Sequence, residues 1–168
     1  AALALAEAGA GGDTLDHARA WLADLDQHYW EDEAHGYCTT ADDAPALIAR
    51  TKSILDSALP AGNAVALEVI ARLHLLDGDT ALRQRADQLV EAFAGQLDSN
   101  LLAMPSYLNS VELLQGATQV ILVGDRNSAE IQAFLTILTQ HPGATTILSV
   151  VDPTHRFPTD HPAAGKGQ

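Results

Sequence analysis

The chain has 168 residues, of which 47% are hydrophobic and only 5% aromatic, and it carries a formal net charge of −13. This length is typical of one domain with enough apolar material for a core without disulfides or metals. The abundant Ala and Leu residues favour helices, and the acidity argues against nucleic acid or an anionic membrane surface as a partner.

Cys38 is the one cysteine in the sequence, which excludes an internal disulfide, a C-x-x-C redox pair and a cysteine-based zinc site. A lone thiol is typical of a reducing compartment, so we expect a cytoplasmic protein. No apolar run approaches the roughly 20 residues of a membrane-spanning helix, and residues 1–13 lack the basic start of a signal peptide. Residues 1–8 read instead as the last turns of a helix from a longer protein.

Apolar residues recur at steps of three and four, which predicts amphipathic helices. One helix should follow a cap at Asp13 or Thr14 and end near Trp30. Helix should resume at or just after Pro60, a further helix should cover residues 80–97, and residues 99–115 should be helical with an interruption at Pro105. Because short turns join these helices, we expect antiparallel αα-hairpins. Residues 37–40 and 47–50 have the composition of short paired strands, and residues 51–60 that of an irregular connection.

The last third of the chain has the composition of strands as well as of helix. Residues 119–123 and 145–151 are apolar, β-branched runs that flank a helix capped at Asn127 or Ser128, which predicts a βαβ unit with a parallel strand pair. Two strands alone are marginally stable, so a third strand from elsewhere is expected. We therefore predict a mostly α fold: helical hairpins over residues 1–117, a βαβ appendage over 118–151 and a loose tail over 152–168.

The most specific pattern lies in residues 30–63. It reads Trp30-x-Asp32, Gly36-Tyr37, Thr40 and then Arg50-x-Lys52-x-x-x-Asp56-x-Ala58-x-Pro60-x-Gly62-Asn63. The pattern resembles the C-terminal region of thioredoxin-domain-containing proteins of the spermatogenesis-associated type. The resemblance implies a toroid of antiparallel helical hairpins, an (α/α) toroid similar to N-acylglucosamine 2-epimerases and six-hairpin glycosidases, of which this chain is the last part. Its partners would be the thioredoxin-like domain and the remaining toroid of the same protein.

Two positions depart from the family pattern, because Ala61 and Ala64 stand where the family usually has serine. If either hydroxyl of the family has a chemical role, this chain has lost it. A role in capping a helix would be kept by Asn63.

Arg50, Lys52 and Asp56 are the candidate catalytic residues. In an extended segment, positions 50 and 52 point the same way, so the two cations could hold a carboxylate or a sugar hydroxyl while Asp56 acts as acid or base. The alternative is a set of ion pairs that ties an irregular loop to the helices. The catalytic interpretation requires these side chains to converge on a concave, solvent-filled space.

The candidate ligand-binding residues are Asn63, Trp30, Tyr37 and Asp32. Asn63 stands at a helix start, where free N–H groups could bind a polar ligand, or it caps that helix. Asp32 belongs either to a carboxylate pair of the glycosidase kind or to a solvated acidic turn. Trp30 and Tyr37 could stack on a sugar ring or anchor the hairpin core.

The sequence has no H-E-x-x-H, nucleotide-binding glycine motif or nucleophile elbow, so we predict no cofactor and no metal. Two functions stay open. The first is carbohydrate binding or processing by part of a toroid. The second is a non-catalytic helical scaffold or protein-interaction module, which predicts a large exposed apolar patch and no polar cavity.

Overall fold

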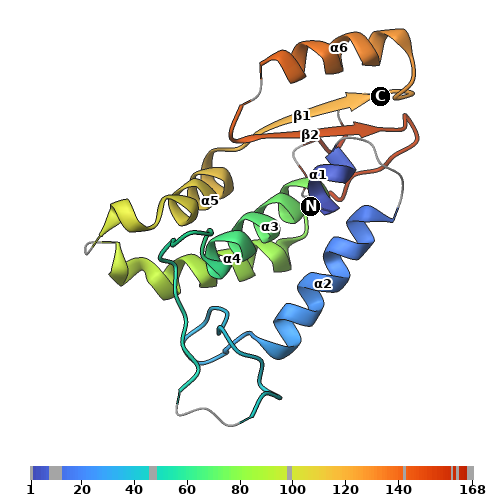
Figure 1. The fold of residues 1–168 in the computed structure, drawn as a ribbon. Helices are drawn as coiled ribbons and strands as arrows, with labels where there is room; N and C mark the ends of the chain where they lie inside the picture. Colours follow the sequence, from blue (N-terminus) through green and yellow to red (C-terminus); the bar gives the residue numbers. More distant parts are fainter. Residues whose placement is uncertain are drawn as a thin grey trace.

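A computed structural model describes residues 2–7, 13–45, 49–97, 100–141, 143–159, 161 and 163–165. They form a helical body with a small α/β unit at one end (Figure 1). The helices are α1 (Ala2–Glu7), α2 (Thr14–His28), α3 (Gly62–Asp77), α4 (Thr80–Phe93), α5 (Pro105–Gly116) and α6 (Ala129–Gln140), with two short 3-10 helices at Ala94–Gln96 and Leu101–Ala103. The strands are β1 (Thr118–Val123) and β2 (Thr146–Val151). The prediction of a mostly helical fold with a small parallel sheet is confirmed.

Helix α3 forms the centre of the helical body and packs against both α4 and α5. Its residues Leu67, Ile70 and Leu73 are fully buried, because a helix between two neighbours needs apolar side chains on more than one face. The helix ends at Gly78, whose φ of 71° is the left-handed conformation that favours glycine. The Asp79 side chain then accepts a hydrogen bond from the Ala81 N–H at 2.8 Å and caps α4. No helix in the described ranges is long and apolar enough to cross a bilayer.

The α/β unit is the predicted βαβ motif. Strands β1 and β2 run parallel in a register that places Thr118 opposite Thr146 and Val123 opposite Val151. Ser128 caps α6 by accepting a hydrogen bond from the Ile131 N–H at 3.3 Å. The described residues contribute only these two strands to the sheet.

Glu7 of α1 joins the helical body to the α/β unit. Its carboxylate accepts a hydrogen bond from Arg72 of α3 at 2.9 Å, and its backbone carbonyl accepts one from Arg126, in the loop after β1, at 3.0 Å. Helix α1 also contacts β2. The first and last thirds of the chain are therefore packed together.

One prediction of local structure is wrong and another is confirmed. Residues 37–40 do not form a strand, since a single bridge pairs Tyr37 with Trp30. Cys38 and Thr39 donate to the carbonyls of Tyr29 and Thr51, and the side chain of a helix residue bonds to Tyr37, as described below. Their predicted partner, residues 47–50, lies partly outside the described residues, and Ala49 and Arg50 are not in a strand. The predicted interruption at Pro105 is confirmed, since the 3-10 helix ends at Ala103, Met104 is not helical and Pro105 begins α5. Proline is accepted there because the first helical position needs no N–H.

The prediction of a loose tail over residues 152–168 needs one correction. Its described residues after Val151 form no helix or strand, but His161 is only 3% exposed. Its ring stacks on Phe157 with the centroids 4.3 Å apart. A Cβ placed on Gly78 would lie 3.2 Å from the same ring. The tail is therefore docked on the C-terminal end of α3.

Candidate functional site

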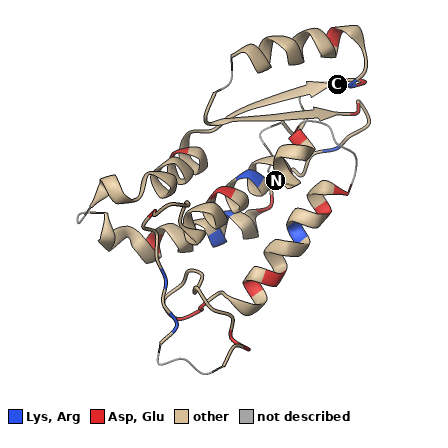
Figure 2. Cartoon of the chain, in the orientation of Figure 1, with Lys and Arg blue, Asp and Glu red and all other residues tan. Residues whose placement is uncertain are grey.

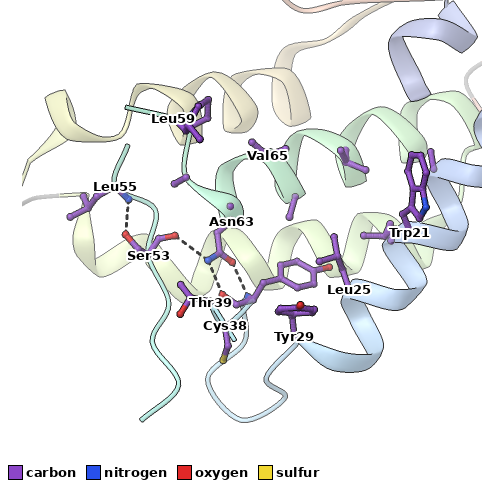
Figure 3. A pocket seen from close by; sticks show the side chains of 18 of the residues that line it. Trp21, Leu25, Tyr29, Cys38, Thr39, Ser53, Leu55, Leu59, Asn63 and Val65 are labelled. Carbon is purple, nitrogen blue, oxygen red and sulfur yellow. Dashed lines mark hydrogen bonds between the residues drawn. The ribbon is translucent and has the colours of Figure 1, made fainter. Parts of the chain in front are cut away.

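Asn63, in the first turn of α3, is 3% exposed and bonds to two segments of the preceding loop. Its side-chain oxygen accepts a hydrogen bond from the Tyr37 N–H at 2.8 Å, and its Nδ2 donates to the carbonyls of Tyr37 at 2.9 Å and Ser53 at 3.0 Å (Figure 3). The amide thus pairs with extended backbone as a neighbouring strand would. The residue that precedes α3 is Ala61, without a side-chain cap, so the prediction that Asn63 caps the helix is wrong.

Arg50 joins the end of α2 to the extended segment that follows the acidic turn. Its Nη2 donates to the carbonyl of His28 at 2.8 Å and to that of Thr40 at 2.8 Å, and its Nε donates to the same Thr40 carbonyl at 3.1 Å. The predicted ion pair with an acidic side chain is replaced by bonds to backbone oxygens. Arg50 therefore holds the loop in place.

Lys52 makes a comparable set of contacts in the acidic turn itself. Its Nζ forms an ion pair with the Glu31 carboxylate and donates to the carbonyl of His35 at 2.6 Å. The ammonium group lowers the pKa of Glu31 from its usual value. His35 and Gly36 both have positive φ, 51° and 91°, so the chain reverses direction sharply around the lysine.

Asp56 bridges the starts of two helices. One carboxylate oxygen accepts a hydrogen bond from the Ala61 N–H before α3, and the other accepts one from the Ser106 N–H in α5, both at 2.8 Å. The Ser106 bond, followed by the Ala61 bond, holds the pKa of Asp56 below its usual value. The predicted acid or base is therefore an ionised group whose two oxygens are both bound to backbone.

Trp30 has neighbours on its ring faces and at its edge. The Arg85 guanidinium lies 3.9 Å from the ring centroid, and the His35 ring stacks on it at 5.7 Å. The Trp30 and Tyr37 rings meet edge to face, with their centroids 5.1 Å apart. The Trp30 ring is therefore in contact with three side chains of the chain itself.

Tyr37 and Asp32 occupy contrasting environments. Tyr37 is 5% exposed, and its hydroxyl donates to the Asp26 carboxylate at 2.6 Å. Burial, with that carboxylate, raises the pKa of Tyr37 above its usual value. Asp32 is exposed in the acidic turn, as the solvated-loop alternative expects.

A hollow lies between α2 and α3, with residues 53–61 at one end and Ala2 and Leu3 of α1 also in its wall. We call it the α2–α3 groove (Figure 3). Its volume is about 770 Å³, within the range of ligand pockets, roughly 300–1,000 Å³. No charged side chain lines it within the described part of the chain, and its polar wall residues include Tyr29, Thr39, Ser53 and Asn63.

Of the candidate residues, only Tyr37 and Asn63 line the α2–α3 groove. The structure brings Arg50, Lys52 and Asp56 into the surrounding loop, where each one bonds to backbone. They do not line this common cavity.

The sequence did not identify the exposed apolar residues that line the groove. Four apolar side chains in its wall are strongly exposed: Trp21 at 57%, Leu55 at 48%, Leu59 at 74% and Val65 at 45%. The sequence held one signal, because Trp21 sits at the edge of the apolar stripe of α2. Leu59, in an irregular segment, carried none.

A histidine and two aspartates, residue types that can bind a metal ion, lie close together outside the groove. Ligand atoms of His28, Asp42 and Asp43 lie within 4.8 Å of one another. The His28 ring nitrogen is 3.0 Å from the Asp42 carboxylate, and this contact raises the pKa of His28. The histidine–aspartate ion pair accounts for the arrangement.

No protein-family model matches the chain, and comparison with curated proteins finds no relative with significant similarity.

Proposed function

We propose that this chain is a helical interaction module whose α2–α3 groove receives the apolar face of a neighbouring helix. The observation that carries the proposal is the concentration of exposed apolar side chains in one uncharged hollow, among them Trp21, Leu59 and Val65. Such a side chain standing alone on a surface is ordinary, but a contiguous hollow of them is typical of an interaction site.

A helix fits this groove because two helices already form its walls. On α2 the lining residues are spaced by three and four positions: Ala18, Trp21, Leu22, Leu25 and Tyr29. On α3 the corresponding row includes Val65, Ala66 and Val69. A third helix seated between two such rows can interdigitate its side chains with both.

The polar groups in the groove wall support an apolar occupant. Asn63 uses its oxygen and both N–H groups of its amide on Tyr37 and Ser53. An apolar helix face seated over Asn63 would therefore leave no donor of this amide unmatched.

In this proposal, the 50–63 motif is a structural frame. Arg50 and Lys52 fix the loop to the end of α2 and the acidic turn. Asp56 and Asn63 fix it to the starts of α3 and α5. Since residues 53–61 form the end wall of the groove, these bonds give the groove its shape without any catalytic step.

The resemblance supplies an occupant for the groove. It would be another hairpin of an (α/α) toroid, from a part of a thioredoxin-domain-containing protein that this chain does not include. Carbohydrate binding by the same motif remains the competing proposal, and the experiment below separates the two.

The test uses Trp21 as a reporter. The chain has two tryptophans, so Trp30→Phe leaves Trp21 as the only one. The probe is a synthetic helix of about 18 residues, or five turns, with leucines at i, i+3, i+4 and i+7 and lysines on the opposite face. We expect a saturable blue shift of Trp21 emission as its ring leaves water, and no shift with a scrambled peptide of the same composition.

A matched pair of variants locates the binding. Leu59→Asp introduces a charge into the groove and should abolish the shift. Leu102→Asp makes the same change at a residue that is 94% exposed outside the groove, and it should leave binding unchanged. Equal binding of the scrambled peptide, or equal loss in both variants, would overturn the proposal. A rise in Tm with N-acetylglucosamine, without peptide binding, would favour the carbohydrate function instead.

A further inference from the structure

Strand β1 has an open edge. The Thr118 N–H donates to the Thr145 carbonyl at 3.0 Å, so the even-numbered residues of β1 point their backbone groups toward β2. The backbone groups of Gln119, Ile121 and Val123 therefore point to the opposite edge, where no strand pairs with them in the described part of the chain. The strand carries no charged side chain (Figure 2), although charges are the usual protection of an edge against pairing.

Helix α6 covers one face of the sheet with a stripe of apolar residues. Ile131 is 7% exposed, and Leu135 and Leu138 are half-buried on the same side of the helix. Two further large apolar residues, Phe134 and Ile137, remain 55% and 56% exposed. The two-stranded sheet does not cover the side chains of these two residues.

The two flanks of α6 differ in polarity. One flank carries Phe134 and Ile137, and the other carries Gln132 and Thr139. In a right-handed crossover, which βαβ units almost always adopt, the flank with Phe134 lies on the side of β1 that faces away from β2. The uncovered apolar side chains and the unpaired backbone of β1 therefore border the same edge.

The dimensions of this edge suit a twofold axis. A crossover helix centred over its two strands has its axis about half a strand spacing from each of them in projection. If β1 paired with an antiparallel copy of itself at the usual spacing of about 4.8 Å, the two α6 axes would lie about 10 Å apart. Packed helices are separated by about 8–10 Å, so strand pairing and helix packing can occur together.

The exposed flank of α6 is also self-complementary. In order, its residues are Glu130, Phe134 and Ile137, followed by His141 just after the helix, whose Nδ1 lies 3.1 Å from the Ile137 carbonyl. Consider two antiparallel copies in which Phe134 of one packs against Ile137 of the other. Glu130 of one copy then lies opposite His141 of the other, because Glu130 precedes Phe134 by four positions and His141 follows Ile137 by four. A carboxylate thus faces an imidazole that can donate a hydrogen bond to it, at both ends of an apolar centre.

We propose that the chain binds a second copy of itself through β1 and this flank of α6, forming a continuous sheet in the order β2-β1-β1-β2. The interface would be isologous, as in most homodimers. It would also convert a marginal two-stranded sheet into a wider one. The inference is independent of the α2–α3 groove and of the function proposed for it.

The test is the mass of the full chain by sedimentation across micromolar concentrations. We expect the wild type to approach twice its monomer mass of 17.7 kDa. Ile137→Glu should remain at the monomer mass, because it buries a carboxylate at the twofold axis. Thr136→Glu adds the same charge at an exposed position outside the flank and should dimerise as the wild type does. In the dimer, hydrogen exchange of the Ile121 amide should slow relative to Ile137→Glu.

A charge exchange tests the pairing of the two ends. His141→Glu would place a carboxylate opposite Glu130 of the other copy and should raise the Kd about tenfold or more. Adding Glu130→Lys should restore the wild-type Kd. The proposal would be overturned by a wild type that stays monomeric or by a double variant whose Kd is not restored. It would also be overturned if Leu59→Asp dissociated the dimer and Ile137→Glu did not.

Discussion

Asp56 and Ser106 lie 50 positions apart, and the Asp56 carboxylate accepts a hydrogen bond from the Ser106 N–H at 2.8 Å. Its other oxygen accepts a hydrogen bond from the Ala61 N–H, also at 2.8 Å. Both amides stand at helix starts, of α5 and α3, where N–H groups lack intrahelical partners and negative charge is favoured. One carboxylate outside both helices therefore caps two of them.

Asp56→Asn should destabilise the fold by about 2 kcal/mol, because hydrogen bonds to a charged acceptor are the stronger kind and the amide nitrogen cannot accept one. Urea unfolding followed by circular dichroism measures the change. The matched control is Asp32→Asn, in the exposed acidic turn, for which we expect a change of less than about 0.5 kcal/mol. Equal effects of the two substitutions would contradict the double-capping role.

The stability difference between the wild type and Asp56→Asn should depend on pH. The folded-state pKa of Asp56 is depressed, so its contribution is present above the unfolded pKa, about 3.9, and is lost as the pH drops through the lower folded value. The two proteins should therefore differ at pH 7 and converge below about pH 4. Urea midpoints measured over this range would show it, and a difference that does not change with pH would exclude the carboxylate as the source.

Asn63→Asp should be more disruptive, by about 3 kcal/mol, since it would place a carboxylate oxygen against the carbonyls of Tyr37 and Ser53 in a buried site. Asn109→Asp makes the same chemical change on the exposed side of α5 and should have little effect. Thermal unfolding compares the two. If Asn63→Asp melts with the wild type, the amide does not organise the loop.

Gly78→Ala should destabilise the chain by about 1–2 kcal/mol, because the residue has φ of 71° and a Cβ there would lie 3.2 Å from the His161 ring. Gly116→Ala, at the end of α5, has no heavy atom within 4 Å of the added Cβ and should be neutral or slightly stabilising. Adding His161→Ala to Gly78→Ala should recover the part of the loss that comes from contact with the tail. No recovery would assign the whole loss to backbone strain.

The helices and the βαβ unit could be predicted because their signal is local. The stripe of α4, which includes Ala86, Leu89 and Phe93, needs only its own 3.6-residue period to be recognised. The break before Pro105 could also be predicted, because proline cannot donate a hydrogen bond inside a helix and is accepted at its first position.

The sequence indicated which segment holds the candidate residues, but it did not predict the hydrogen-bond partners of their side chains. Arg50 and Lys52 bond largely to the carbonyls of His28, Thr40 and His35, and every residue type offers a carbonyl, so no sequence pattern identifies such partners. The strand predicted at residues 37–40 was wrong for a similar reason. Its Tyr37 bonds to the side chain of Asn63, 26 positions away and inside a helix, while Cys38 and Thr39 each donate to a carbonyl of a different segment.

The described part of α1 spans six residues, and a helix segment of this length gains its stability from packing against the rest of the chain. The backbone carbonyl of its Glu7 is held by Arg126, 119 positions further along the chain, and the helix also contacts β2. During synthesis, α1 leaves the ribosome long before either partner exists, and closing so long a stretch of chain slows folding. The first of the described helices to be made should therefore be among the last to be ordered.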